Sequence, residues 1–490
     1  MNRKPQKGSK AAMSTIIRNE QRMIELRVSG DPLLNHYRSL SLSPLKDGKV
    51  AYRFAKKLET KLDRIEAAQI LSGSKEVTLP PRDTKGCFSI GKSCHSGEDY
   101  FISLSDLVKH LIICGASGSG KTNLIILIIH ALHRQVWMCF IDHKDEGGRI
   151  LNHFSDTSYI PLNQQRWNCL RGAGKSQKDY IRYFAELISK IMALVINTSN
   201  AAQAKLLSLC ADKDDLPSIS DLCAIFHKIA EEERRNNLHT AARAFDDLAA
   251  TMGQWASVRK GPFSFDEHAL SIIPLKDLPT AYENLFITLL FKQFMDQASS
   301  LGHTSDISRM FIMDEGRAFF GKEFETGTGS GRFNIQTQIM TKGRSYGFGI
   351  CIGTQSAAML QATVVDNAGT FIVLRTNSEQ EAKFCCRRLG IEDRRYRELM
   401  ELETGVAWIV SPRCTQPVQI RIPYYDIGDY ISDTEIAHKM APTWENWDAQ
   451  SDFSKIKADD TAKMDFRKIL GEDQEIDSPI PAAQDAPEPQ

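Results

Sequence analysis

The sequence predicts an α/β fold with a mostly parallel sheet and helices on both faces. Apolar runs alternate with helical stretches from residue 87 to about residue 426. One of these runs leads into a glycine-rich turn and then an apolar helix. More than 120 residues of helical character separate residues 142 and 270, far more than a simple crossover needs. We therefore expect a sheet core over residues 87–149 and 266–426, interrupted by a helical subdomain over residues 150–265.

The expected strands are short runs of apolar and β-branched residues bounded by turn residues. The parallel candidates are Leu111–Cys114, Val136–Asp142, Leu270–Leu275, Met310–Met313, Gly349–Gly353 and Phe371–Arg375. Two further runs, Ala407–Val410 and Val418–Ile422, are separated by prolines and predict a closing hairpin. Within the insertion, we expect helices over Tyr180–Ile196 and Ile219–Glu233, the second capped by Ser218 or Ser220.

Both ends of the chain differ in composition from the core. Residues 1–15 are rich in Lys, Ser and Gln and predict a disordered basic leader, and residues 16–80 predict helices, with three- and four-residue apolar spacing over Tyr52–Leu71. Residues 427–490 form an extension with an acidic tail that we expect to be disordered from about residue 470.

Charge and cysteine usage restrict the class of protein. Residues 1–86 hold 18 Lys/Arg and 9 Asp/Glu, whereas residues 443–490 hold 5 and 12. The basic end fits nucleic acid, an acidic partner, the acidic end itself or a plain solvated surface. The 11 scattered cysteines contain no CxxC pair, which favours reduced core thiols. No apolar run of about 18 residues and no signal sequence appear, so we expect a cytoplasmic protein without membrane insertion.

The glycine-rich turn has the Walker A pattern. A buried strand, LIIC, precedes it and an apolar helix follows, which is the context that the motif requires. The loop predicts nucleotide binding through backbone N–H groups, with the Lys121 ammonium on the β- and γ-phosphates and the Thr122 hydroxyl on Mg²⁺. The nucleotide-binding residues are Gly115, Ala116, Ser117, Gly118, Ser119, Gly120, Lys121 and Thr122.

A second apolar run, MFIM, ends on two acids. We expect Asp314 to bind Mg²⁺ and Glu315 to orient the attacking water as the catalytic carboxylate. Because parallel strands deliver their C-terminal residues to one edge, Gln355 at the end of GICIGT should meet the γ-phosphate or the water there. Together these motifs predict a P-loop NTPase fold of the RecA-like (ASCE) type that uses ATP and Mg²⁺.

Several other polar residues have roles that the sequence leaves open. Arg344, in the loop before the Gln355 strand, is the candidate to stabilise γ-phosphate charge from a neighbouring subunit, with Arg317 and Arg332 as rivals. Asp142, His143 and Lys144 follow another strand. They either contact nucleotide or polymer or cap the next helix.

In order, GASGSGKT, FIDHK, the helical insertion, FIMDE and GRSYGFGICIGTQS resemble the HerA/FtsK superfamily of P-loop motors, which includes conjugative and type IV secretion coupling ATPases. The resemblance spans about residues 87–426 and implies a hexameric ring that moves DNA or protein through a pore. The chain departs from the family in its helical N-terminal region, where HerA proteins have a β-barrel, and in lacking the membrane helices of FtsK.

The leading hypothesis from the sequence is a DNA-translocating ATPase ring. One alternative is a coupling or packaging ATPase that delivers DNA or protein to a secretion channel or capsid, and another is a nucleotide-gated hexameric scaffold for a partner nuclease or effector. The segment Phe319–Gln336, with Lys322, Arg332 and Lys342 in or near it, is either a pore loop for DNA or a surface loop.

Overall fold

The computed structural model describes residues 7–26, 31–42, 48–71, 79–80, 82, 86–161, 164, 166–174, 176–211, 215–260, 268–275, 278–322 and 335–453. Within them, eleven strands form one sheet in the order β2-β1-β12-β11-β10-β3-β9-β8-β4-β7-β5. The strands are β1 (Cys87–Ser93), β2 (Asp99–Ser103), β3 (Leu111–Cys114), β4 (Trp137–Asp142), β5 (Thr157–Tyr159), β7 (Leu270–Pro274), β8 (Thr304–Met313), β9 (Tyr346–Thr354), β10 (Thr370–Val373), β11 (Val406–Ser411) and β12 (Cys414–Arg421).

The sheet is parallel from β10 to β5 and antiparallel from β10 to β2. The central parallel strands are apolar and buried on both faces, as a sheet covered by helices requires. The predicted mostly parallel sheet and closing hairpin are therefore confirmed. Strand β9 lies between the Walker A strand β3 and the Walker B strand β8.

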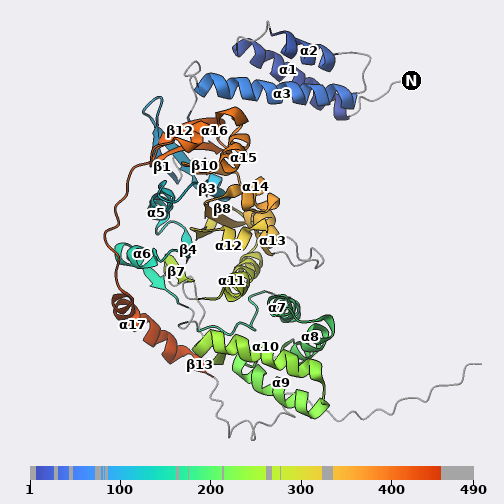
Figure 1. Cartoon of the computed structure of the whole chain (residues 1–490), viewed down its shortest axis with the longest axis vertical. Coiled ribbons are helices and arrows are strands. Elements are labelled where there is room, and N and C mark those ends of the chain that lie inside the picture. The colour runs from blue at the N-terminus through green and yellow to red at the C-terminus, as the bar shows by residue number, and fades with distance from the viewer. Residues whose placement is uncertain are drawn as a thin grey trace, which may run out of the picture. The chain divides into compact units, whose positions relative to one another are not determined.

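Helices cover both faces of this sheet. Figure 1 shows α5 and α6 on one side and α11, α13, α14 and α15 on the other. The helices of this part are α4 (Leu104–Leu107), α5 (Lys121–Leu132), α6 (Gly147–His153), α11 (Thr280–Leu301), α12 (Arg317–Phe320), α13 (Ile335–Lys342), α14 (Ala362–Asn367), α15 (Glu379–Leu389) and α16 (Tyr396–Met400). The 3₁₀ turns are η5 (Gly343–Ser345), η6 (Ala357–Met359) and η7 (Asp393–Arg395).

Three strands of this sheet were not predicted, and several others, β8 above all, are longer than predicted. Strands β1 and β2 pair with each other and β1 pairs with β12, where polar residues such as Lys92 mask the period-2 pattern. Strand β5 has three residues, too few for a pattern to be visible. Strand β8 begins at Thr304, which pairs with Tyr346 of β9 before an irregular, mostly exposed stretch that leads to the regular pairing from Arg309 onward. Apolar runs therefore located the buried strands and missed the polar ones.

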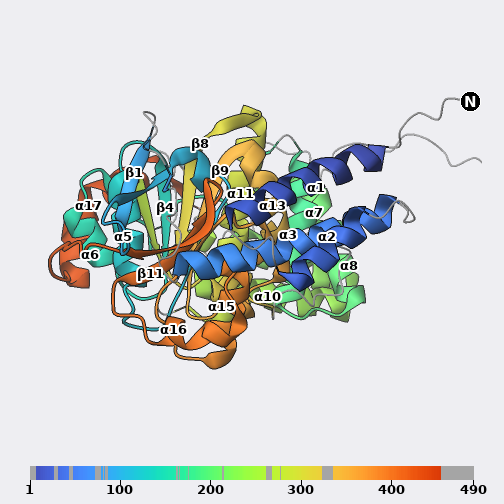
Figure 2. The same cartoon turned by 90° about the horizontal axis from the view of Figure 1, so that it is seen from above.

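The N-terminal region forms three helices that lie side by side in both views: α1 (Lys7–Glu25), α2 (Pro32–Leu42) and α3 (Gly48–Leu71) (Figures 1 and 2). Their apolar core consists of Met23, Leu26, Leu34, Leu58 and Leu62. Because α1 already begins at Lys7, the prediction of a disordered leader over residues 1–15 is corrected: the segment KAAM consists of good helix formers. Residues 1–6 and the acidic tail from residue 454 lie outside the described residues.

By their contacts the described residues divide into two units, with boundaries at Pro161/Leu162, Phe263/Ser264 and Ala441/Pro442. The first unit holds the sheet. The second contains α7 (Gln177–Ile191), α8 (Ile196–Cys210), α9 (Ile219–Glu233), α10 (Asn236–Met252), η2 (Gly253–Ser257) and the paired strands β6 (Val258–Lys260) and β13 (Asp452–Phe453). Helix α17 (Asp433–Gln450) spans the last boundary, which falls at its interior proline.

The helical insertion was expected over residues 150–265, but α6 and β5 belong to the sheet unit, so its N-terminal boundary lies later. Helix α9 has the predicted bounds, and Ser218 caps it through a reciprocal capping box with Asp221. The helix predicted over residues 180–196 ends earlier, near Ala193, which has a positive φ of 50°. No helix in the described ranges combines the length and apolarity that crossing a membrane requires.

Candidate nucleotide-binding and catalytic site

The Walker A loop connects the buried strand β3 to helix α5. Its first residues bond to the ends of both neighbouring strands: Gly115 N donates to Thr354 O at 3.1 Å and Ala116 N donates to Arg375 O at 2.7 Å. Gly118 and Gly120 have φ values of 71° and 107°, in the left-handed region that favours glycine. The loop is thus fixed to the sheet while its backbone turns into the N-terminus of α5, a geometry suited to phosphate oxygens.

The Lys121 side chain lies inside this loop. Its ammonium donates to Gly115 O at 2.5 Å and to Ala116 O at 2.8 Å, and the residue is 5% exposed. Burial, and to a smaller extent the positive charge of Lys144, lower the pKa of Lys121 to about 8. A buried ammonium held only by neutral carbonyls gains from a nearby anion, so its placement fits a phosphate group.

Asp314 lies at the end of β8 and is 1% exposed. Its Oδ1 accepts the backbone N–H of His143 at 3.1 Å, while its buried Oδ2 has no hydrogen-bond partner within the described part of the chain. Burial raises the pKa of Asp314 to about 7. An under-compensated carboxylate oxygen at this position is a suitable ligand for a hard divalent cation, so the residue fits the predicted Mg²⁺ site.

Glu315 and Gln355 meet at the same edge of the sheet. Gln355 Nε2 donates to Glu315 Oε2 at 3.4 Å, although 40 residues separate the two along the chain. The Glu315 side chain is 23% exposed, so it remains accessible to solvent, unlike Asp314. The structure therefore brings together the two residues that the sequence predicted would act on the attacking water.

Asp142, the last residue of β4, and Lys144, two residues later, divide between the alternatives that the sequence left open. Asp142 caps α6: its carboxylate accepts the N–H groups of Lys144, Glu146 and Gly147 at 3.0, 3.1 and 2.7 Å. The Lys144 ammonium instead reaches the acidic pair, 3.9 Å from Asp314 Oδ2 and 3.6 Å from Glu315 Oε2. Lys144 is thus a cation of the site, and Asp142 fixes the loop that carries it.

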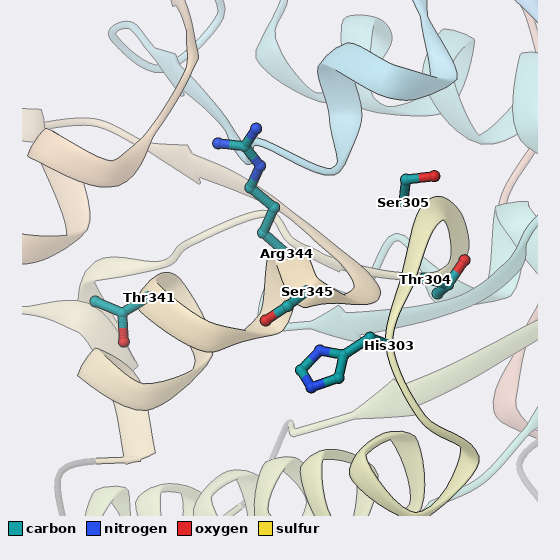
Figure 3. A pocket seen from close by; sticks show the side chains of 6 residues that line it. All are labelled: His303, Thr304, Ser305, Thr341, Arg344 and Ser345. Carbon is teal, nitrogen blue, oxygen red and sulfur yellow. The ribbon is translucent and has the colours of Figure 1, made fainter.

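Arg344 lies in η5, at the start of β9, whereas Gln355 follows the end of the same strand. Nine extended residues span about 30 Å, so Arg344 cannot contact the Walker A loop of its own chain. It lines an open pocket with His303, Thr304, Ser305, Thr341 and Ser345, and its guanidinium points away from His303 (Figure 3). Of its rivals, Arg317 is exposed at the start of α12 and Arg332 lies outside the described residues.

Two residues of the site were not singled out from the sequence. The Arg375 carbonyl, just after β10, accepts the Ala116 N–H, so this arginine lies beside the Walker A loop; its position at the end of a strand was the available signal. Glu381 on α15 is buried and contacts both the end of β3 and the turn after Gln355. The second contact could not be predicted from the sequence, because it depends on how α15 packs.

Solved structures share this architecture. VirB4 of Thermoanaerobacter pseudethanolicus superposes with a TM-score of 0.56 at 14% identity, over 71% of this chain and 99% of that one. Plasmid coupling protein TrwB in complex with ADP and Mg²⁺ gives a TM-score of 0.52 at 13% identity, over 73% and 93%. The chain has the P-loop NTPase fold. Both matches confirm the predicted fold class.

The likeness is structural: no protein-family model and no curated protein matches the sequence. In this P-loop NTPase fold, β9 separates the Walker A and Walker B strands. That extra strand is what carries Gln355 to the Walker B acids, in agreement with the predicted RecA-like (ASCE) sheet.

Proposed function

We propose that this chain is a Mg²⁺-dependent ATPase that works as a ring motor on DNA. The observation that carries the proposal is the hydrogen bond from Gln355 to Glu315, at the sheet edge that also holds the Walker A loop. A partly exposed carboxylate with an amide beside it can accept a proton from water and orient that water toward a γ-phosphate. Lys121 would hold the triphosphate.

Mg²⁺ would be held by the Thr122 hydroxyl and by Asp314, directly or through water. The buried Oδ2 of Asp314, which lacks a hydrogen-bond donor among the described residues, supports this assignment. When bound, the ion would offset the negative charge that develops on the phosphate oxygens. The chain's own contribution is to fix Asp314 through the His143 N–H and to keep it out of bulk water.

The position of Arg344 supports the proposed ring. In one chain it lies about 30 Å from Gln355 along β9, too far to act in the same site. An arginine at the opposite edge of the sheet can complete a site only in a neighbouring subunit. Arg344 lies on an exposed turn, where its guanidinium is accessible to such a neighbour. We infer that Arg344 acts in trans on the γ-phosphate, in a homo-hexamer.

DNA as the substrate rests on the names of similar structures and on one cation. One protein among the similar structures, TrwB, is named a bacterial conjugative coupling protein and a plasmid coupling protein. Lys322 is exposed directly after the Walker B strand and α12, at the start of the segment that the sequence offered as a pore loop. Lys342 is not part of that segment, because α13 carries it to the turn before β9.

The test is ATP hydrolysis by the purified full-length chain, with and without long duplex DNA. We expect hydrolysis that requires Mg²⁺, is abolished by Lys121→Ala and is stimulated by DNA; Lys92→Ala, an exposed lysine on β1, is the matched control. Hydrolysis without stimulation in an assembled ring would favour the nucleotide-gated scaffold for a nuclease or effector. Stimulation only by a secretion or packaging partner would favour the coupling or packaging ATPase.

A further inference from the structure

Glu381 is a buried carboxylate on α15, 5% exposed and three residues after the N-cap Ser378. The spacing resembles a capping box, in which Glu381 would accept the N–H of Ser378. Only half of that box forms: Ser378 accepts the Glu381 N–H at 3.5 Å, and the Glu381 carboxylate faces other segments. A buried charge directed away from its own cap requires other partners.

Those partners come from two segments of the nucleotide site. Oε1 accepts the Ala357 N–H at 2.7 Å and the Cys114 thiol at 3.3 Å, and Oε2 accepts the Ser356 hydroxyl at 2.5 Å. The Ala358 N–H lies 3.3 Å from both oxygens. Cys114 is the last residue before the Walker A loop, and Ser356 is the first residue after Gln355. One carboxylate thus joins the loop strand β3 to the turn that follows Gln355.

Gln355 therefore lies between two fixed points. On its N-terminal side, the Thr354 carbonyl accepts the Gly115 N–H, and on its C-terminal side the next three residues bond to Glu381. A side chain in a turn keeps one orientation only where its backbone is fixed, and catalytic groups lose rate steeply when misplaced by about 1 Å. We therefore expect the hydrogen bond from Gln355 to Glu315 to depend on these backbone contacts on either side of Gln355.

The same cluster has a second reading, as a metal site. Cys114, Glu381 and Cys385 offer ligand atoms within 4.8 Å of one another. However, both Glu381 oxygens already accept backbone N–H or hydroxyl donors, and the Cys385 thiol lies 3.5 Å from Glu381 Oε1 as a further donor. Donors directed at the carboxylate occupy the positions that a cation would need, so the contacts favour a structural clamp.

We propose that Glu381 is a positioning residue for hydrolysis, which acts through the backbone of residues 356–358 to hold Gln355 against Glu315. This rests on the proposed ATPase function. The Glu381 carboxylate contacts none of the predicted nucleotide-binding residues. Its loss should therefore slow the hydrolysis step and leave ATP binding unchanged. Glu381→Gln keeps the shape of the side chain, but its amide N–H₂ then faces hydrogen-bond donors of residues 356–358 and cannot accept from them.

The experiment compares Glu381→Gln with Glu379→Gln, an exposed neighbour on the same helix that pairs with Lys383. We expect Glu381→Gln to lower kcat about tenfold or more with ATP affinity within about twofold, and Glu379→Gln to match the wild type. Ser356→Ala, which removes one donor and leaves α15 intact, should lower kcat in the same direction by less. Nucleotide binding and thermal unfolding establish that each variant is folded.

A double-mutant cycle separates positioning from general loss of structure. If Glu381 acts through Gln355, adding Glu381→Gln to Gln355→Ala should lower kcat no further, whereas independent effects would multiply. Wild-type kcat in Glu381→Gln, or multiplied losses in the cycle, would overturn the proposal.

A second readout does not need turnover: the affinity for Mg²⁺·ADP with aluminium fluoride, a mimic of the transferring phosphoryl group, relative to Mg²⁺·ADP alone. Glu381→Gln should lower that ratio, and an unchanged ratio would count against the clamp. Failure of the wild type to hydrolyse ATP would contradict the proposed function, while this affinity ratio would still test Glu381.

Discussion

The Gln355 side-chain amide donates a hydrogen bond to the Glu315 carboxylate, with Nε2 and Oε2 3.4 Å apart. The two residues follow adjacent parallel strands, β9 and β8, so the sheet itself sets their separation. The Lys144 ammonium, 3.6 Å from the same oxygen, adds a positive charge on the other side. Glu315 is thus held by an amide and an ammonium and still remains partly exposed, as a residue that orients water must be.

Glu315→Gln should lower the rate of ATP hydrolysis by about a hundredfold or more, because an amide cannot accept the proton of the attacking water. ATP binding should remain, since Lys121 and the loop are untouched. Single-turnover hydrolysis, with bound nucleotide identified by chromatography, checks both expectations. Asp306→Asn, an exposed acid at the other end of β8, is the control. Turnover at the wild-type rate in Glu315→Gln would remove this residue from the catalytic role.

Arg344→Ala should also lower hydrolysis, but its deficit should be complemented by another inactive subunit. If Arg344 serves the neighbouring site, mixing Arg344→Ala subunits with Lys121→Ala subunits creates some interfaces that combine an intact loop with an intact arginine. We expect activity above that of either parent, and wild-type specific activity that rises with protein concentration. Mixed assemblies as inactive as their parents, or full activity of a wild-type monomer, would argue against a shared site.

The motif residues were predictable from the sequence because their chemistry is local. Gly118 and Gly120 require left-handed backbone, and the apolar strand before them fixes where the loop begins. The end positions of β8 and β9 then placed Glu315 and Gln355 at one edge. Parallel strand geometry is enough to predict that meeting, although it cannot give the 3.4 Å contact.

Contacts made by packing could not be predicted in this way. Glu381 looks like half of a capping box from its sequence, and only the packing of α15 turns its carboxylate to Cys114 and Ser356. The choice of Lys144 over Asp142 as the residue that reaches the acids likewise depends on how the loop after β4 turns. Strands β1 and β2 were missed because polar residues such as Lys92 interrupt the pattern of β1, whose pairing with β12 is a long-range contact.

His110 predicts a pH dependence of stability. It is 1% exposed, has a φ of 62° and lies 3.2 Å through Nε2 from Met340 O; burial lowers its pKa to about 4, with Arg344 contributing. Because this pKa is below the unfolded value of 6.5, the neutral ring's contribution is complete above pH 6.5 and is lost as pH falls toward 4. That contribution is at most about 3 kcal/mol.

His110→Asn should flatten this dependence. Asn tolerates a positive φ and carries no group that titrates between about pH 4 and 7. The midpoint of thermal unfolding, compared at about pH 7 and about pH 5, should fall less in this variant than in the wild type. His438→Asn, an exposed histidine on α17, is the control. An equal fall in His110→Asn and in the wild type would show that other groups dominate the acid response.

Asp221 should contribute strongly to the stability of the helical unit. Its carboxylate accepts the Ser218 N–H at 2.9 Å and pairs with Arg259 through Nε at 2.7 Å and Nη2 at 2.9 Å, with 3% of its side chain exposed. Asp221→Asn keeps the cap but loses the charge that Arg259 requires, so α9 should lose about 2 kcal/mol of local stability. Hydrogen exchange of α9 peptides measures this.

The matched control for that change is Asp179→Asn. Asp179 holds the same position at the start of α7, where Ser176 is the cap, but its side chain is 73% exposed. We expect exchange in α7 to change by well under 1 kcal/mol, because exposed pairs are weak. Equal effects of the two substitutions would mean that the Arg259 pair adds nothing to the capping box.

DNA stimulation should depend on the cations of the segment after α12. Lys322 is exposed just after α12, and Arg332 follows in the same segment of the sequence. If this segment contacts DNA phosphates and Arg344 is the arginine of the shared site, Lys322→Ala with Arg332→Ala should reduce DNA-stimulated hydrolysis and leave the basal rate unchanged. Each lost phosphate contact should also reduce the dependence of log affinity on log salt by about one unit.

Lys383→Ala, an exposed lysine on α15, is the control. The measurement is steady-state ATPase against DNA concentration at two salt concentrations. A double variant with wild-type stimulation and an unchanged salt slope would place the DNA contact elsewhere on the chain, and a wild-type ring that DNA does not stimulate at either salt concentration would contradict the motor itself.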